Sequence, residues 1–373
     1  MRKADPSPAI ATIRDVARLA SVSVATVSNV LNRTRPVAAE TRERVLRAVQ
    51  ALGYTPDAAA RSMRGRSSGL IGLIVADITN PFFTSLVHAV ERAAQVHGHA
   101  VVLCNSDEDL AREERHLQLL RTQRVDGIIL AATGQPSSAR SAALALLHTP
   151  VVLVDRGLDE LGLDAVVLDN RRAALDATRH ILSFGHRRVA MIGGPPSIST
   201  GAERLAGYRE ALLEAGIAYD PDRVRDAGFR EEAAYDAAGE LLQLPPARRP
   251  TALFAANSLI AIGVMRAVAD AQLRCPEDVS VVSIDDFAWA NAFRPRLTTV
   301  AQPVDLMGEA AVRLLMGRMT GTVTAAPRTE VMAPFLVVRD SCCAPAARPA
   351  RAARAERAVR AVRALSENGP PGV

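Results

Sequence analysis

The chain has 373 residues, of which 49% are hydrophobic, so it is long enough for two or three packed domains and too apolar for a disordered protein. Its net charge is +5 at pH 7, but residues 1–69 contain twelve Arg or Lys and only five Asp or Glu, a net charge of +7. This concentration of positive charge indicates a polyanionic partner for the N-terminal segment rather than for the whole chain.

Several classes of protein are excluded at once. The apolar runs are much shorter than the roughly 20 residues that a membrane helix needs. Residues 1–10 lack the apolar stretch of a secretory signal, so we expect a cytoplasmic protein. The four cysteines have no C-x-x-C spacing and no nearby histidine pair, which favours reduced thiols and predicts neither a metal site nor a cofactor.

Residues 1–55 are predicted to form three helices. Thr12 and Asp15 make a capping pair before the first helix, Ser23 caps the second, and Gly53 ends the third, which begins near Ala38. A three-residue turn between the first two helices is typical of a helix-turn-helix, although an ordinary three-helix subdomain has the same periodicity. The apolar side chains that face inward are Ile13, Val16, Ala17, Ala20, Val27, Val30, Leu31, Val45, Ala48, Val49 and Leu52.

The start of the second helix presents small and polar side chains outward. They are Val24, Ala25, Thr26, Ser28 and Asn29. A face of this kind at a helix N-terminus suits entry into the major groove of DNA.

Residues 56–69 are predicted to be a hinge. Asp57 can cap a short helix that Gly65 ends, and such a helix is too short to be stable alone in water. The segment is therefore either a helix that forms when it docks or a plain flexible linker.

Residues 70–340 alternate short apolar runs with helical patterns. This alternation predicts an α/β fold with two Rossmann-like lobes, each a parallel sheet covered by helices, and a cleft at the carboxyl ends of the strands. The predicted strands are 70–76, 100–104, 127–131, 151–154, 189–192, 252–255 and 279–284, with a last strand at 336–339. The predicted helices are 82–96, 110–122, 173–182, 204–214 and 259–269.

Enzyme signatures are missing from this α/β region. No G-x-G-x-x-G follows the first strand, the only lysine of the chain is Lys3, and no G-x-S-x-G elbow lies within residues 70–340. A dehydrogenase, a nucleotide hydrolase and a serine hydrolase are therefore disfavoured. A Rossmann-like enzyme and a sugar-binding protein without a DNA role stay as the rival interpretations.

The N-terminal segment of three predicted helices, residues 1–55, which we call the headpiece, closely resembles that of the lactose-repressor family. The likeness runs from Thr12-Ile13-Arg14-Asp15-Val16-Ala17 through Val22 to Asn32, and continues at Thr41 to Val45 and Leu52 to Asp57. It implies that Val24, Ala25 and Asn29 read base edges and that Thr26 and Ser28 contact phosphates. It also implies a minor-groove hinge helix with Ala60 and with Met63 as an apolar wedge.

The resemblance extends to residues 70–340, the sensor region, which is similar to the pentose-binding proteins of the periplasm, a group of type I periplasmic binding proteins. Polar side chains follow the predicted strands at Asn80, at Asp155 and Arg156, at Asn257 and at Asp285. Together with Phe83, Arg204, Phe229 and Gln302 they match the sugar pocket of those proteins. Carboxylates, amides and guanidinium groups can bond sugar hydroxyls, and the two phenylalanines can cover the faces of the ring.

Some of these positions have simpler interpretations. Asp155 and Arg156 could be a solvated ion pair, and Asp285 could be a helix cap. Phe82 is expected in the core, while Trp289 could close the cleft or pack within its loop. Ser258 stands where the family usually has aspartate, which leaves the hydrogen-bond support of Asn257 open.

The resemblance ends near Asp340, and residues 341–373 are predicted to be an Ala- and Arg-rich, solvated tail. We therefore predict a sequence-specific transcriptional regulator, a repressor and not an enzyme. It is expected to bind a pseudo-palindromic operator as a homodimer or higher homo-oligomer, and to respond to a monosaccharide held between its lobes.

Overall fold

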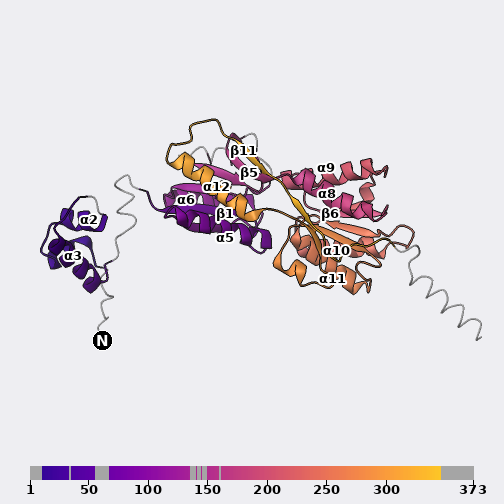
Figure 1. Ribbon diagram of the computed structural model, residues 1–373, viewed down its shortest axis with the longest axis horizontal. Coiled ribbons are helices and arrows are strands. Elements are labelled where there is room, and N and C mark those ends of the chain that lie inside the picture. Colours follow the sequence, from indigo (N-terminus) through magenta and orange to yellow (C-terminus); the bar gives the residue numbers. More distant parts are fainter. Residues whose placement is uncertain are drawn as a thin grey trace, which may run out of the picture. The chain divides into compact units, whose positions relative to one another are not determined.

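A computed structural model of the chain describes residues 11–32, 35–54, 67–134, 140, 144, 149–158 and 161–345. The chain divides into two compact units, Met1–Ser68 and Gly69–Val373 (Figure 1). Within the described part, no helix is long and apolar enough to cross a membrane. Residues 55–66, which include Ala60, Met63 and most of the predicted hinge, lie outside the described residues.

The N-terminal unit contains three helices, α1 (Ile13–Leu19), α2 (Val24–Asn32) and α3 (Ala39–Leu52). The predicted caps are present. The Asp15 carboxylate accepts hydrogen bonds from the backbone N–H and the hydroxyl of Thr12 at 3.0 and 2.6 Å, and the Ser23 hydroxyl accepts from the Thr26 N–H at 3.1 Å. Gly53 ends α3 in the left-handed region (φ 57°), which glycine adopts without a steric penalty.

A small core holds these helices together. Its fully buried members come from all three helices or their ends, and Tyr54 packs against them. They are Val16, Ala17, Ala20, Val27, Val30, Val45 and Ala48. The predicted inward face is therefore correct, and Val24 and Ala25 at the start of α2 are exposed.

The first lobe of the C-terminal unit is a six-stranded sheet in the order β11-β5-β4-β3-β1-β2. Helices α5 and α12 pack together on one face, where they share a core with β1, β3 and β4, while α6 covers the other face. The elements are β1 (Leu70–Val75), α5 (Pro81–Val96), β2 (Ala100–Asn105), α6 (Leu110–Thr122), β3 (Gly127–Leu130), β4 (Val151–Val154), β5 (Asp164–Leu168), α12 (Val304–Met319) and β11 (Thr329–Met332).

The second lobe repeats this architecture with the strand order β12-β10-β9-β8-β6-β7. Helices α8 and α9 pack against each other, as do α10 and α11 (Figure 1). Its helices are α8 (Asn170–Ser183), α9 (Ser199–Glu214), α10 (Glu231–Gln243) and α11 (Ser258–Asp270). Its strands are β6 (Val189–Gly193), β7 (Val224–Asp226), β8 (Ala252–Ala255), β9 (Ser280–Ile284), β10 (Thr298–Ala301) and β12 (Phe335–Val337). Two short 3-10 turns, η2 (Pro221–Arg223) and η3 (Ala288–Asn291), complete it.

The chain passes between the lobes three times, after β5, after β10 and between β11 and β12. The described strand pairs are parallel, as predicted, with one exception: β12 runs antiparallel to β10. The strands at these crossovers lie at one edge of each sheet, β5 and β11 in the first lobe and β10 and β12 in the second.

Two expectations need correction. The sequence did not predict β5, β7, β10, β11, α10 and α12. The tail also begins later than residue 341, because Ser341 is fully buried on the second lobe. Its hydroxyl accepts from the Thr298 N–H at 2.8 Å and donates to the Val281 carbonyl at 2.6 Å. Residues 346–373 lie outside the described part.

Candidate functional site

A polar pocket is formed by residues of both lobes, at the carboxyl ends of their strands. It encloses about 410 Å³ of space that atoms do not fill, counted with the solvent at its mouth. All the side chains predicted for effector binding line it: Asn80, Phe83, Asp155, Arg156, Arg204, Phe229, Asn257, Asp285 and Gln302. Their role in binding stays a prediction, but the fold does bring them together.

Two asparagines stand at helix N-termini on opposite sides of the pocket. The Asn80 side-chain oxygen accepts from the Phe82 N–H at 3.0 Å at the start of α5, and the Asn257 oxygen accepts from the Ile260 N–H at 2.8 Å at the start of α11. Each cap fixes the orientation of the amide. The support of Asn257, which the sequence left open, therefore comes from α11 itself and not from the side chain of Ser258.

Two buried carboxylates face the pocket, Asp155 after β4 and Asp285 after β9, both with positive φ (67° and 72°). Burial raises the pKa of Asp155 to about 6, although Arg156 and Arg204 act against this shift. Burial also raises the pKa of Asp285, while Arg204 and a hydrogen bond from Gln302 (2.6 Å) oppose it. Asp155 is buried, so a solvated ion pair does not describe it. Asp285 does accept from the backbone N–H of Ser258, the first residue of α11, at 3.4 Å, so it shares in the cap of this helix with Asn257.

Two buried arginines have different surroundings. Arg156 donates to both carboxylate oxygens of Glu108, at 2.8 and 2.5 Å. Arg204, on α9, donates from Nε to Asn170 (2.8 Å) and from Nη1 to the Ala256 carbonyl (2.6 Å). No ion pair of Arg204 with a carboxylate occurs among the described residues, and burial lowers its pKa. Arg204 is therefore a charged donor whose partners here are neutral.

Aromatic rings border the pocket on two sides. Phe83 comes from α5, and Phe229, at φ 58°, has its ring centroid 5.9 Å from the Arg204 guanidinium. Gly194 lies under Phe229, where a Cβ would collide with the ring. Phe82 packs in the core as predicted, and it also lines the pocket. Trp289 does not line it: its side chain is 58% exposed and packs edge-on against Phe287 in its own loop.

Other lining residues were missed from the sequence. Asp77 and Glu108 follow β1 and β2, so the rule that found Asp155 would also have found them. Thr200 precedes Arg204 by one turn of α9, and Gly228 and Arg230 flank Phe229. These three could have been found only because they lie close in sequence to a residue that was predicted.

The fold and this pocket agree with what the chain is similar to. Residues 12–57 match the model for bacterial regulatory proteins of the lacI family, and residues 178–342 match a periplasmic binding protein-like domain. The ribose operon repressor of Escherichia coli is 36% identical over 334 residues, which cover 89% of this chain and 100% of that protein. The chain belongs to the lacI family. It is therefore a DNA-binding transcriptional regulator and not an enzyme.

Other relatives support this membership. The repressor PurR of Photobacterium profundum is 35% identical over 89% of this lacI-family chain and 98% of that protein. A lac repressor dimer bound to operator and the anti-inducer ONPF superposes with a TM-score of 0.79 at 27% identity, over 90% of this chain and 99% of that one. A complex of the regulator CelR with cellobiose superposes with a TM-score of 0.68 at 35% identity, over 89% of this chain and 99% of that one.

In this lacI-family regulator, α2 is the helix predicted to enter the major groove. Val24 and Ala25 are exposed at its first turn, and Thr26, Ser28 and Asn29 are partly buried. The Thr26 hydroxyl lies 2.9 Å from that of Ser23, so its position is set by the N-terminal cap. The contact of each residue with bases or phosphates stays a prediction.

Proposed function

We propose that this regulator, acting in the cytoplasm as a homodimer or higher homo-oligomer, changes its affinity for a pseudo-palindromic operator when a neutral monosaccharide binds between its lobes. Val24, Ala25 and Asn29 would read bases, and Thr26 and Ser28 would contact phosphates. Ala60 and Met63 of the hinge would contact the minor groove.

The mixture of donors and acceptors around one pocket carries this proposal. Asp155 and Asp285 offer carboxylate acceptors, Arg204 is a donor without a carboxylate partner among the described residues, and the caps leave the amide N–H groups of Asn80 and Asn257 available. A sugar hydroxyl both donates and accepts, so this set satisfies it, whereas the four carboxylates that line the pocket outnumber its three arginines and oppose an anion.

The relatives support the same class of ligand. A lacI-family regulator from Enterococcus faecium with bound ribose is 28% identical and superposes with a TM-score of 0.66. A carbohydrate, cellobiose, is also bound in the CelR complex. The two rings at the borders of the pocket, Phe83 and Phe229, would cover the C–H faces of such a ligand.

The fold suggests how ligand binding reaches DNA. Three crossovers let the lobes rotate, and a ligand that contacts both lobes favours one arrangement of them. The first lobe begins at Gly69, whose N–H donates to Asp126 at 2.8 Å, so the chain that leads from the headpiece is attached to that lobe. A ligand that shifts the lobes would then change the population of the DNA-binding state, in either direction.

A thermal-shift screen of the full chain with free pentoses and hexoses, and with adenine as a comparison, tests the proposal, because a true ligand raises the unfolding temperature by mass action. Calorimetry then gives the affinity of the sugar found. Asp285→Ala and Arg204→Ala should each weaken it by at least about 30-fold, since each leaves buried partners unsatisfied. Arg209→Ala, at an exposed position of the same helix as Arg204, should not.

The DNA response is measured by fluorescence anisotropy on a sequence that the full chain selects from a random library. The selected sugar should change this affinity for the wild type and for Arg209→Ala, but not for Asp285→Ala. Wild-type affinity for the sugar in both pocket variants would refute this site. A wild-type chain that no sugar stabilises would refute the proposed ligand class.

A further inference from the structure

The residues that line the pocket differ in how far they are exposed to solvent. Of the fifteen residues that line the pocket, twelve are buried, and the three that are partly exposed are Glu108, Gly228 and Arg230. Glu108 belongs to the first lobe, and the other two precede α10 in the second. The lining is therefore least buried at these two loops, and we call this part of the pocket its mouth.

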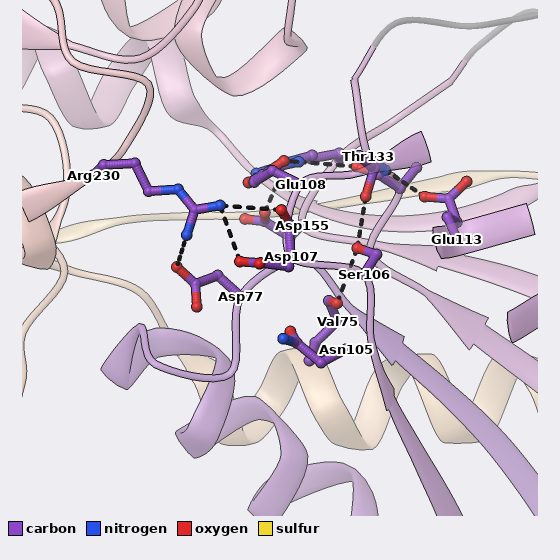
Figure 2. Close-up of polar contacts among 12 residues, drawn as sticks. Val75, Asp77, Asn105, Ser106, Asp107, Glu108, Glu113, Thr133, Asp155 and Arg230 are labelled. Carbon is purple, nitrogen blue, oxygen red and sulfur yellow. Dashed lines mark hydrogen bonds and ion pairs between the residues drawn. The ribbon is translucent and has the colours of Figure 1, made fainter. Parts of the chain in front are cut away.

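Arg230 crosses this mouth. From the second lobe its Nη1 donates to Oδ2 of Asp77 at 3.1 Å, and its Nη2 donates to the backbone oxygen and Oδ1 of Asp107, both at 3.0 Å. Figure 2 shows the guanidinium between these two aspartates, which follow β1 and β2 of the first lobe. One side chain thus joins two loops of one lobe to the other lobe.

The acceptors on the first lobe are fixed by contacts of their own. The other oxygen of Asp77 accepts from the N–H and the hydroxyl of Thr79, at 2.9 and 2.6 Å. The other oxygen of Asp107 accepts from Arg112 at 3.0 Å. Acceptors held in place in this way lose less conformational entropy when Arg230 arrives than two free surface side chains would.

The donor side is also constrained. Gly228 and Phe229 both have positive φ, 57° and 58°, and the Asp226 carboxylate accepts from the Gly228 N–H at 2.9 Å. This tight turn places the Phe229 ring in the pocket and the next side chain, Arg230, at the mouth. The position of Arg230 therefore depends on the same turn that forms one wall of the pocket.

We infer that Arg230 is the gate of the ligand pocket and its size-determining residue: the Arg230 bridge to Asp77 and Asp107 closes the mouth over a ligand of one sugar ring and excludes a second ring. The size limit rests on the proposed sugar-binding function, whereas the closure does not. A second contact between the lobes, from the Ser258 hydroxyl to Asn80 at 3.0 Å, is buried and so cannot serve as the gate.

The experiment compares the full-length wild type with Arg230→Ala and with Arg225→Ala. Arg225 is a matched control, because it is a partly exposed arginine of the same lobe that pairs with Glu240 of that lobe. Hydrogen exchange without any sugar measures closure. In Arg230→Ala, peptides that cover residues 77–80 and 105–110 should exchange at least about fivefold faster, and in Arg225→Ala they should not change.

The size limit is measured by thermal shift with D-ribose, D-glucose and cellobiose. The wild type should respond to a monosaccharide and not to cellobiose, and Arg230→Ala should gain a response to cellobiose. Unchanged exchange in Arg230→Ala would overturn the gate, and a wild-type response to cellobiose would overturn the size limit. If no sugar stabilises the wild type, the proposed ligand class fails together with the size limit, while the exchange data still decide the closure.

Discussion

Lowering the pH from about 7.5 to about 5 should weaken sugar binding about tenfold, with Asp155 as the main cause. Burial holds the pKa of this carboxyl at about 6. Hydroxyls that donate to the carboxylate stabilise its ionised form, so the pKa should fall toward its ordinary value of about 4 in the complex. Binding then releases a proton, and the affinity decreases as the pH falls from about 6 to about 4. Over that range, a shift of about two units gives the tenfold loss at pH 5.

The stability of the folded chain without ligand changes with pH in the direction opposite to that of the sugar affinity. The pKa of Asp155 is higher in the folded chain than in the unfolded one, so without ligand the folded state binds more protons between pH 4 and 6, and this carboxyl lowers the stability as the pH rises through that interval. Calorimetry at both pH values, in buffers of different ionisation enthalpy, measures the affinity and the released proton. Because the pKa of Asp285 is also raised, the variant Asp155→Asn is needed to show which carboxyl is responsible. The sugar affinity of this variant should vary with pH much less than that of the wild type. An affinity that is equal at both pH values in the wild type, without proton release, would refute the reasoning.

Two further changes test the headpiece and the second lobe. Asn29→Ala should weaken binding to the selected operator by about 1–3 kcal/mol and leave nonspecific DNA nearly unaffected, as measured by anisotropy; equal losses on both would make Asn29 a phosphate contact. Gly207→Ala should lower the unfolding free energy by about 1–3 kcal/mol in denaturant titrations, because a Cβ would collide with the Arg171 carbonyl of α8. Gly239→Ala, where a Cβ meets nothing, is its control, and equal stability of the two variants would contradict this packing argument.

The parts of the fold that the sequence predicted are those with a strong local signal. Central strands such as β1 and β8 are buried on both faces and appear as continuous apolar runs. The edge strands β7 and β11 lack this signal and were missed, although the edge strands β2 and β12 were predicted and the buried inner strands β5 and β10 were not. β7 has only three residues, and β11 alternates exposed and half-buried positions beside a single neighbour. The assignment of α12 and β11 to the first lobe was also beyond reach, because periodicity does not tell which sheet an element joins.

The pocket was predictable to the extent that it follows strand ends. Asp155 and Asp285 end strands of two different sheets, and parallel strands place such residues at one edge. The Arg230 bridge could not be found in this way. Its partner Asp77 lies 153 positions away in the sequence, and a charged residue at the start of a helix is usually solvated. Only the closed arrangement of the two lobes gives that arginine its partners.

Asn257 and Ser258 are neighbours in the sequence, but the side-chain hydrogen bond of Asn257 lies within its own helix, whereas that of Ser258 is made to the other lobe. The N-terminus of α11 orients Asn257 through its own backbone, so the pocket amide does not depend on which side chain follows it. Position 258 is therefore available for another contact. A serine hydroxyl can donate to the Asn80 oxygen, which already accepts from the Phe82 N–H, whereas an aspartate carboxylate would place a negative charge beside that oxygen. The serine thus supplies a buried hydrogen bond between the two lobes, which favours the same arrangement of the lobes as the Arg230 bridge.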